Sequence, residues 1–176
     1  DVIDLVHPDD VITRPNTDGV AFRIVQRGTE GHTIDQGLKR MAIEAGVEIH
    51  YGTRREPGDC HIVAAGPKES SAVAFAEIFH TSHPNQVTFQ LNDKLAPGAY
   101  SYLIIIDGIG LICTCLWRQQ KKTSRYLNET IAWYEQHYDL DRRPIKRVGG
   151  KGDFSLPDKY VHEGRYYVGE AGGLQD

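Results

Sequence analysis

Long apolar runs are missing from this sequence, and cysteine is scarce. The longest apolar run extends from Tyr102 to Ile106, far short of the roughly 20 residues that a membrane-spanning helix needs. The start, Asp1-Val2-Ile3-Asp4, has no basic segment leading into an apolar stretch, so no secretory signal is expected. The three cysteines, Cys60, Cys113 and Cys115, form no disulfide framework and suit a reducing compartment. We therefore expect a cytoplasmic protein without a transmembrane segment.

The excess of positive charge that marks most nucleic-acid-binding domains is also missing. The 176 residues include 24 acidic and 20 basic ones, which gives a net charge of -4 and a pI near 6.1. The hydrolase and metalloprotease signatures G-x-S-x-G and H-E-x-x-H do not occur either. We expect no nucleic-acid partner, whereas a small ligand is compatible with this composition.

A helix followed by a strand is the clearest pattern in the first third of the chain. Apolar residues at helical spacing predict a helix over Thr33–Ala45, with Thr33 as its cap and Gly46 as its stop. The alternation over Val47–Tyr51 predicts a strand after the helix, and the segment Val20–Val25 predicts one before it.

The middle of the chain reads as an antiparallel meander followed by a second helix. Asp107-Gly108 lies between two apolar runs and is a strong hairpin signal. The helix is predicted over Thr123–Tyr138, and the charged segment Asp139–Lys151 is predicted to be irregular. The predicted strands are His61–Ala65, Val73–His80, Gln86–Leu91, Ala99–Ile106, Leu111–Trp117 and Arg165–Val168.

This order of elements predicts an α+β fold in which all 176 residues form one module. Residues 67–159 would form an antiparallel sheet packed with helices. Residues 1–66 and 160–176 would flank it as pieces of a parallel sheet that belongs to a larger domain.

Several segments occur in an order that is recognisable as a whole. Val25-Gln26-Arg27-Gly28 precedes a helix that ends in Ala45-Gly46-Val47, and Ile62–Gly66 is a strand that runs into a glycine turn. Tyr100–Leu103 and Val168–Gly173 follow later. In this order the segments resemble FAD-dependent oxidoreductases of the geranylgeranyl reductase and aromatic-hydroxylase type. The resemblance implies an FAD cofactor, FAD-domain-like pieces at residues 1–66 and 160–176, and a substrate-binding-like part between them.

The segment Gly169-Glu170-Ala171-Gly172-Gly173 resembles the second flavin motif of that family, usually written GDAAG. Small residues let a backbone approach a ligand closely, and the resemblance implies that Glu170 replaces an aspartate that binds the ribityl chain. A plain glycine turn after a strand is the alternative.

The glycine fingerprint G-x-G-x-x-G, which holds the ADP half of FAD, is absent from the sequence. The chain is therefore expected to be the central fragment of such a flavoprotein.

Tyr100, Tyr102 and Trp117 are the candidates for an apolar substrate groove, because aromatic side chains with a polar tip suit the mouth of such a site. Ordinary sheet packing is the alternative. Cys113 and Cys115 lie on one strand face, but their spacing differs from the usual zinc hook, so we expect buried small side chains and no metal site.

Two functions remain open. The first is a portion of an FAD-dependent oxidoreductase that acts on a small apolar molecule by flavin hydride transfer, with the isolated chain inactive. The second is a non-catalytic ligand- or partner-binding module that has lost the dinucleotide-binding half. With either one, open sheet edges would allow a homodimer.

Overall fold

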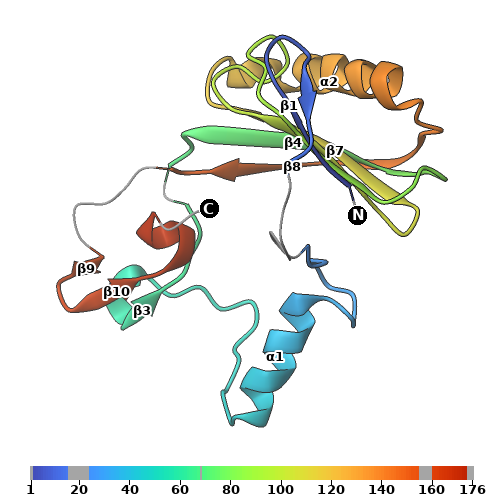
Figure 1. Cartoon of the computed structure of the whole chain (residues 1–176). Helices are drawn as coiled ribbons and strands as arrows, with labels where there is room; N and C mark the ends of the chain where they lie inside the picture. The colour runs from blue at the N-terminus through green and yellow to red at the C-terminus, as the bar shows by residue number, and fades with distance from the viewer. Residues whose placement is uncertain (1, 16–23, 68, 155–159, 174–176) are drawn as a thin grey trace. The chain divides into compact units, whose positions relative to one another are not determined.

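The computed structural model describes residues 2–15, 24–67, 69–154 and 160–173, which belong to two compact units (Figure 1). One unit combines Asp1–Pro15 with His61–Asp176, and the other comprises Asn16–Cys60. The first unit contains two β-sheets and helix α2 (Thr123–Tyr138), and the second contains helix α1 (Ile34–Glu44).

The larger sheet has seven strands in the order β2-β1-β5-β6-β7-β4-β8. Neighbouring strands are antiparallel, except that β1 runs parallel to β5. The expected α+β class with a mostly antiparallel sheet is thereby confirmed. The strands are β1 (Val2–Val6), β2 (Ile12–Thr13), β4 (Ala72–His80), β5 (Gln86–Gln90), β6 (Ser101–Ile106), β7 (Ile109–Leu116) and β8 (Arg143–Gly152).

Helix α2 covers one face of this sheet (Figure 1), and its bounds are those predicted from the sequence. A short 3-10 turn, η2 (Gln120–Lys122), leads into it. Successive side chains of a strand point to opposite faces, so alternate residues of β6 and β7 meet the helix. The core between helix and sheet consists of Phe79, Leu103, Ile105, Ile112, Leu127, Ile131 and Tyr134, all at most 5% exposed.

Strands β5, β6 and β7 form the predicted meander, with Asp107-Gly108 as the turn between β6 and β7. β4 departs from the meander, because it pairs with β7 and β8 rather than with β5. The prediction of an irregular segment over Asp139–Lys151 is wrong, since most of it is β8. Almost all residues of this edge strand are exposed, so the strand lacks the alternation of apolar and polar residues that would predict it from the sequence. Its basic residues are Arg143, Lys146, Arg147 and Lys151.

Strand β1 belongs to the seven-stranded sheet, whereas the sequence predicts residues 1–66 to belong to the flanking parallel sheet. Its Asp4 is 1% exposed and accepts hydrogen bonds from Arg14 Nε at 2.8 Å and from Gln86 Nε2 and Tyr138 Oη at 3.1 Å each. These bonds tie β1 to β5 and to the end of α2, and they compensate a charge that would be costly to bury alone.

A second buried charge joins the edge strand β8 to the rest of the unit. Glu77 of β4 is 3% exposed and forms ion pairs with Arg142 and with Arg147, whose Nε lies 2.9 Å from Glu77 Oε2. Arg142 also pairs with Glu135 of α2 at 2.7 Å, and Arg147 donates to Asn128 at 2.8 Å. Helix α2, strand β4 and the edge strand β8 are thus held by one network.

The smaller sheet has three short strands in the order β3-β10-β9. β10 (Arg165–Tyr167) runs parallel to β3 (Ile62–Val63) and antiparallel to β9 (Val161–His162). A 3-10 turn, η3 (Gly169–Gly172), follows β10. The expected piece of parallel sheet is therefore present, although it joins segments about 100 residues apart in the chain.

The second unit is built on α1, which begins and ends as the sequence predicts. The Thr33 side chain accepts a hydrogen bond from the Gln36 amide, and Gly46 has a φ of 82°. The predicted strand Val47–Tyr51 is wrong: this segment is not a strand, and the Val47 amide returns to the Ala42 carbonyl at 3.0 Å. A strand needs a partner, and none of the described residues of this unit forms a sheet.

The remaining elements of the second unit are few. A 3-10 turn, η1, spans Pro57–Asp59. The predicted strand Val20–Val25 lies mostly outside the described residues, and its last two residues, Ile24 and Val25, are not in a strand.

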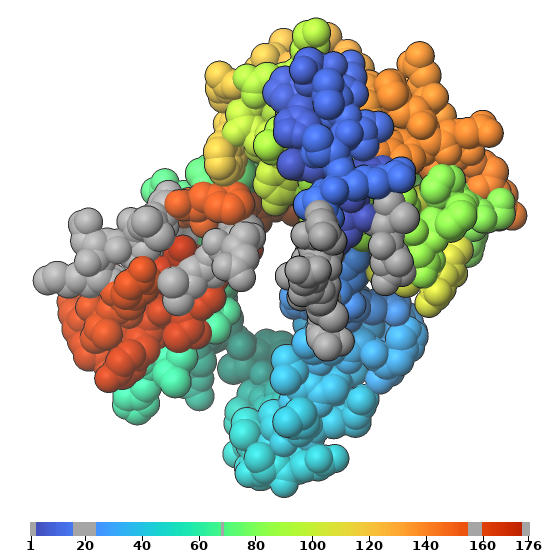
Figure 2. Space-filling view, viewed as in Figure 1, coloured from blue at the N-terminus to red at the C-terminus, as the bar shows by residue number. Residues whose placement is uncertain are grey.

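The apolar side of α1 is uncovered, and the blue-to-cyan atoms of this segment form part of the surface in Figure 2. Leu38 is 58% exposed and Met41 is 64% exposed. None of the helices in the described parts of the chain is long and apolar enough to cross a membrane.

We predict that Gly110→Ala destabilises the first unit. A Cβ at Gly110 would overlap the ring of Phe79, which is fully buried. Overpacking of this kind costs about 1–3 kcal/mol in the free energy of unfolding, which chemical denaturation would measure. Gly150→Ala is the matched control on the same sheet, since its Cβ would meet nothing within 4 Å. Equal stability of the two variants would contradict the prediction.

Candidate functional site

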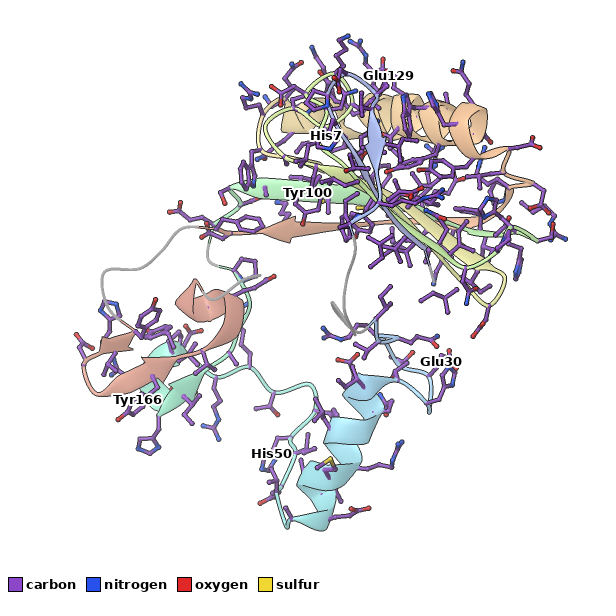
Figure 3. The ribbon with its side chains drawn as sticks, viewed as in Figure 1. His7, Glu30, His50, Tyr100, Glu129 and Tyr166 are labelled. Atoms are coloured by element: carbon purple, nitrogen blue, oxygen red, sulfur yellow. The ribbon has the colours of Figure 1, made fainter. Side chains whose placement is uncertain are left out.

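The three aromatic residues proposed from the sequence line a single pocket in the seven-stranded sheet. Tyr100 precedes β6, Tyr102 lies within it, and Trp117 follows β7 (Tyr100 is labelled in Figure 3). The pocket has a volume of about 210 Å³. Its lining is completed by Ala72, Val73, Ala74, Ala99, Cys115, Gly150, Lys151, Gly152 and Phe154.

The pocket is walled mainly by aromatic rings and small apolar groups. The rings of Tyr100 and Tyr102 are 6.1 Å apart, and Trp117 packs edge-to-face on Phe154 at 5.5 Å. Burial raises the pKa of Tyr102, so its hydroxyl stays protonated as a hydrogen-bond donor. The volume is below the roughly 300–1,000 Å³ of typical ligand sites. It therefore suits a small apolar molecule or one end of a longer one.

The pocket opens on the sheet face opposite α2. Tyr102 pairs in register with Cys113, while its neighbour Leu103 belongs to the core beneath the helix. Residues that share the face of Tyr102 are almost all apolar and form a continuous surface across five strands. They include Ile3, Leu5, Val87, Phe89, Ile104, Leu111, Cys113, Ala74, Ala76 and Ile78.

Strand β8 supplies a wall that sequence reasoning missed. Gly150, Lys151 and Gly152 belong to the segment that was predicted to be irregular, and Phe154 follows it. The pairing of Ala74 with Gly150 brings this wall beside β4. A pair of glycines before Lys151 gives no signal of a binding site without knowledge of that pairing.

The segment Gly169–Gly173 forms the 3-10 turn η3 and its glycine cap. Gly169 and Gly173 have φ values of 57° and 70°, which glycine adopts at little cost. A Cβ at Gly172 would lie 2.6 Å from the Tyr167 carbonyl oxygen, so the turn admits no side chain there. Positions 169, 172 and 173 of this turn therefore favour glycine.

Two glycine turns follow neighbouring parallel strands in the smaller sheet. β3 runs into Gly66, which has a φ of 81°, and β10 runs into Gly169. The Val168 amide donates to the Val63 carbonyl at 3.0 Å, so the strands stay paired up to these turns. Ligands of open α/β sheets bind beyond the carboxyl ends of parallel strands. The structure thus places Gly66 and Gly169 at the same edge of the smaller sheet.

Glu170 is half-buried, and its carboxylate has no hydrogen-bond or ion-pair partner among the residues that the structure describes. A carboxylate accepts hydrogen bonds readily. An unpartnered acid on a turn of small residues is suited to accept one from a ligand hydroxyl. Among the described residues no group of three or more His, Cys, Asp and Glu could hold a metal ion.

In the second unit, the arginine noted before α1 is bound to the start of the helix. Arg27 Nε and Nη2 donate to the Asp35 carboxylate at 2.8 Å, and the Gly28 amide donates to it at the same distance. The hydrogen bond from Arg27, and next that from Gly28, lowers the pKa of Asp35 to about 2. The loop before α1 is thereby held against the helix by an ionised carboxylate.

No family model matches the sequence, and no curated protein matches it. Among solved structures, the chain resembles a geranylgeranyl bacteriochlorophyll reductase-like protein from Thermoplasma acidophilum, with a TM-score of 0.66 and 15% sequence identity. The match covers 98% of this chain and 55% of that one. The chain therefore shares the fold of this protein over almost its whole length and spans about half of the other chain.

We predict that the Asp35 contact is lost only in strong acid. The pKa of Asp35 in the folded chain, about 2, lies below its ordinary value of 3.8. The stability that this carboxylate contributes is therefore complete above about pH 4 and lost as the pH falls through about 2. The amide chemical shift of Gly28, followed by NMR, should titrate with a midpoint near 2. A midpoint near 3.8, or the same titration in Asp35→Asn, would refute this.

Proposed function

We propose that this chain is a portion of an FAD-dependent oxidoreductase that acts on an apolar substrate by flavin hydride transfer in the complete protein. The observation that carries the proposal is the pair of glycine turns at the carboxyl ends of the parallel strands β3 and β10. The shared fold with a geranylgeranyl bacteriochlorophyll reductase-like protein supports it.

The residues of this chain suit one part of a bound flavin. Gly169–Gly173 would hold it through a backbone that no side chain obstructs, and Glu170 would accept a hydrogen bond from a ribityl hydroxyl. A bound reduced flavin supplies hydride, while the protein orients it and shapes the substrate site. Because the sequence has no G-x-G-x-x-G, we expect the isolated chain to be inactive.

The apolar substrate would lie in the pocket of Tyr100, Tyr102 and Trp117. Its rings and small side chains offer dispersion contacts to an apolar molecule. We assign residues 67–152 to the substrate-binding part, and residues 61–66 with 160–173 to an FAD-domain-like part. The low cysteine count continues to favour the cytoplasm.

A non-catalytic binding module is the second candidate, and the missing glycine fingerprint favours it. Such a module would use the same pocket without a flavin. A homodimer through the open sheet edges is compatible with either candidate, but the four cations and Pro144 of β8 oppose pairing at that edge.

FAD binding distinguishes the two candidates. If the flavin proposal is right, added FAD will raise the melting temperature of the chain. The fluorescence of FAD will also change on binding. Replacing Glu170 by Gln should weaken FAD binding about tenfold, because Gln keeps an acceptor oxygen but loses the charge. A hydrogen bond to a charged group contributes about 1.5–3 kcal/mol, against about 0.5–1.5 kcal/mol for a neutral one. Glu163→Gln is the matched control, since Glu163 lies in the β9–β10 turn and pairs with Arg165. A chain that shows no thermal shift with FAD would exclude the flavin role for these residues.

The pocket can be tested independently with a fluorescent isoprenoid probe. Gly150→Leu should abolish probe binding, because Gly150 lines the pocket and a leucine side chain there would fill it. The Cβ of this residue would meet no atom within 4 Å, so the substitution is accommodated by the backbone. Val148→Leu, two residues earlier on β8 and outside the pocket lining, should bind the probe like the unchanged chain. Probe binding that survives Gly150→Leu would show that the apolar ligand does not occupy this pocket.

A further inference from the structure

Among the residues that line the pocket, Cys115 is the one thiol. We propose that Cys115 is a nucleophile that forms a covalent adduct with apolar electrophiles in the pocket, of the class of α,β-unsaturated carbonyl compounds. This inference rests on the proposed role of the pocket as an apolar ligand site, and it requires neither the flavin nor hydride transfer.

The local geometry gives Cys115 two hydrogen-bonding neighbours and access to the pocket. Cys113 and Cys115 lie on the same face of β7, in register with Ala76 and Ala74, and their sulfur atoms are 4.0 Å apart. Cys113 is buried and absent from the pocket lining, whereas Cys115 is half-buried and part of it. Only Cys115 can therefore meet a ligand there.

These neighbours favour the thiolate of Cys115 over that of Cys113. A hydrogen bond from Cys113, and then one from the Tyr100 hydroxyl, lowers the pKa of Cys115 in spite of its burial. The pKa of Cys113 is raised by the same bond and by burial. Cys115 consequently ionises first, and the thiolate is the reactive form of cysteine.

A disulfide between the two cysteines fits the geometry less well than a role for Cys113 as a hydrogen-bond donor. Residues two apart in a strand are separated by about 6.6 Å, close to the upper limit of about 6.8 Å between the Cα atoms of a disulfide. The sulfur atoms would also have to approach from 4.0 Å to about 2.05 Å. The pair thus acts as one nucleophile and its donor.

The addition needs no further reactant. The Cys115 sulfur attacks the β-carbon of the unsaturated carbonyl compound, a C–S bond forms, and the electron pair of the C=C bond shifts towards the carbonyl oxygen. The α-carbon of the resulting enolate then takes up a proton, which replaces the one that the thiol released to solvent. Tyr100 lies beside the sulfur and stabilises it before attack, while Trp117 and Ala74 face the carbon body of the ligand.

The test is a competition within one chain, with Cys60 as the internal reference. Cys60 lies in the other unit, outside the pocket, and its thiol faces the Glu56 carbonyl at 3.6 Å. The full chain would be treated at pH 7 with cyclohex-2-enone and, in parallel, with iodoacetamide, and the adducts quantified by peptide mass spectrometry. We expect cyclohex-2-enone to modify Cys115 several-fold faster than Cys60, because the thiolate is the reactive form of cysteine and the pocket holds the apolar reagent beside Cys115.

Two variants separate thiolate stabilisation from simple accessibility. Tyr100→Phe and Cys113→Ala should each move the pH at which Cys115 alkylation is half-maximal upwards, whereas Tyr166→Phe, on the exposed strand β10, should not. Circular dichroism would establish that each variant is folded. If a variant is not folded, the ratio of the modification rates of Cys115 and Cys60 in the unchanged chain still tests the proposal.

Equal or slower modification of Cys115 relative to Cys60 would overturn the proposal. A Cys115 that reacts with iodoacetamide but not with cyclohex-2-enone would overturn the assignment to apolar electrophiles. If the pH profile of Cys115 alkylation in folded Tyr100→Phe and Cys113→Ala matched that of the unchanged chain, the donor roles of Tyr100 and Cys113 would be overturned. The absence of FAD binding would leave all three results unaffected, so failure of the flavin proposal is distinguishable from failure of this one.

Discussion

The two-residue period of the strands is the constraint on which the rest of the first unit depends. Leu103 and Ile105 are committed to the core beneath α2, so Tyr102, which precedes Leu103, must point to the opposite face. The same alternation in β7 places Ile112 under the helix and Cys113 away from it. Packing of one helix on one face thereby defines an apolar surface on the other, and the pocket lies in that surface.

Buried charges complete this arrangement where apolar packing ends. Glu77 sits on the helix side of β4, and its two arginine partners hold the exposed strand β8 in place. β8 in turn provides one wall of the pocket through Gly150. A polar network on one face of the sheet therefore contributes to the shape of an apolar site on the other. In the smaller sheet, parallel pairing of two segments that are distant in the sequence brings Gly66 and Gly169 to one edge.

Local signals accounted for much of the fold. The helix Thr123–Tyr138, the cap at Thr33 and the hairpin at Asp107 depend on side chains within a few residues, and each was predicted where it occurs. The predictions that were wrong concern pairing. Val47–Tyr51 alternates like a strand but has no partner strand in its unit, and β8 lacks alternation yet pairs along β4. Backbone hydrogen bonds, which a local pattern does not reveal, decided both cases.

By itself the sequence determined the two helices, most of the strands of the meander, the alternation that separates the sheet faces, and the glycines at which the chain turns. It also pointed to Tyr100, Tyr102 and Trp117 as a group, because aromatic side chains with a polar tip suit the mouth of an apolar site. Only the tertiary structure decided that these three border one pocket and that Cys115 lies among them. The physical reason is that a pocket is formed by strands adjacent in the sheet, and the order of strands is set by long-range packing that the spacing along the chain does not encode.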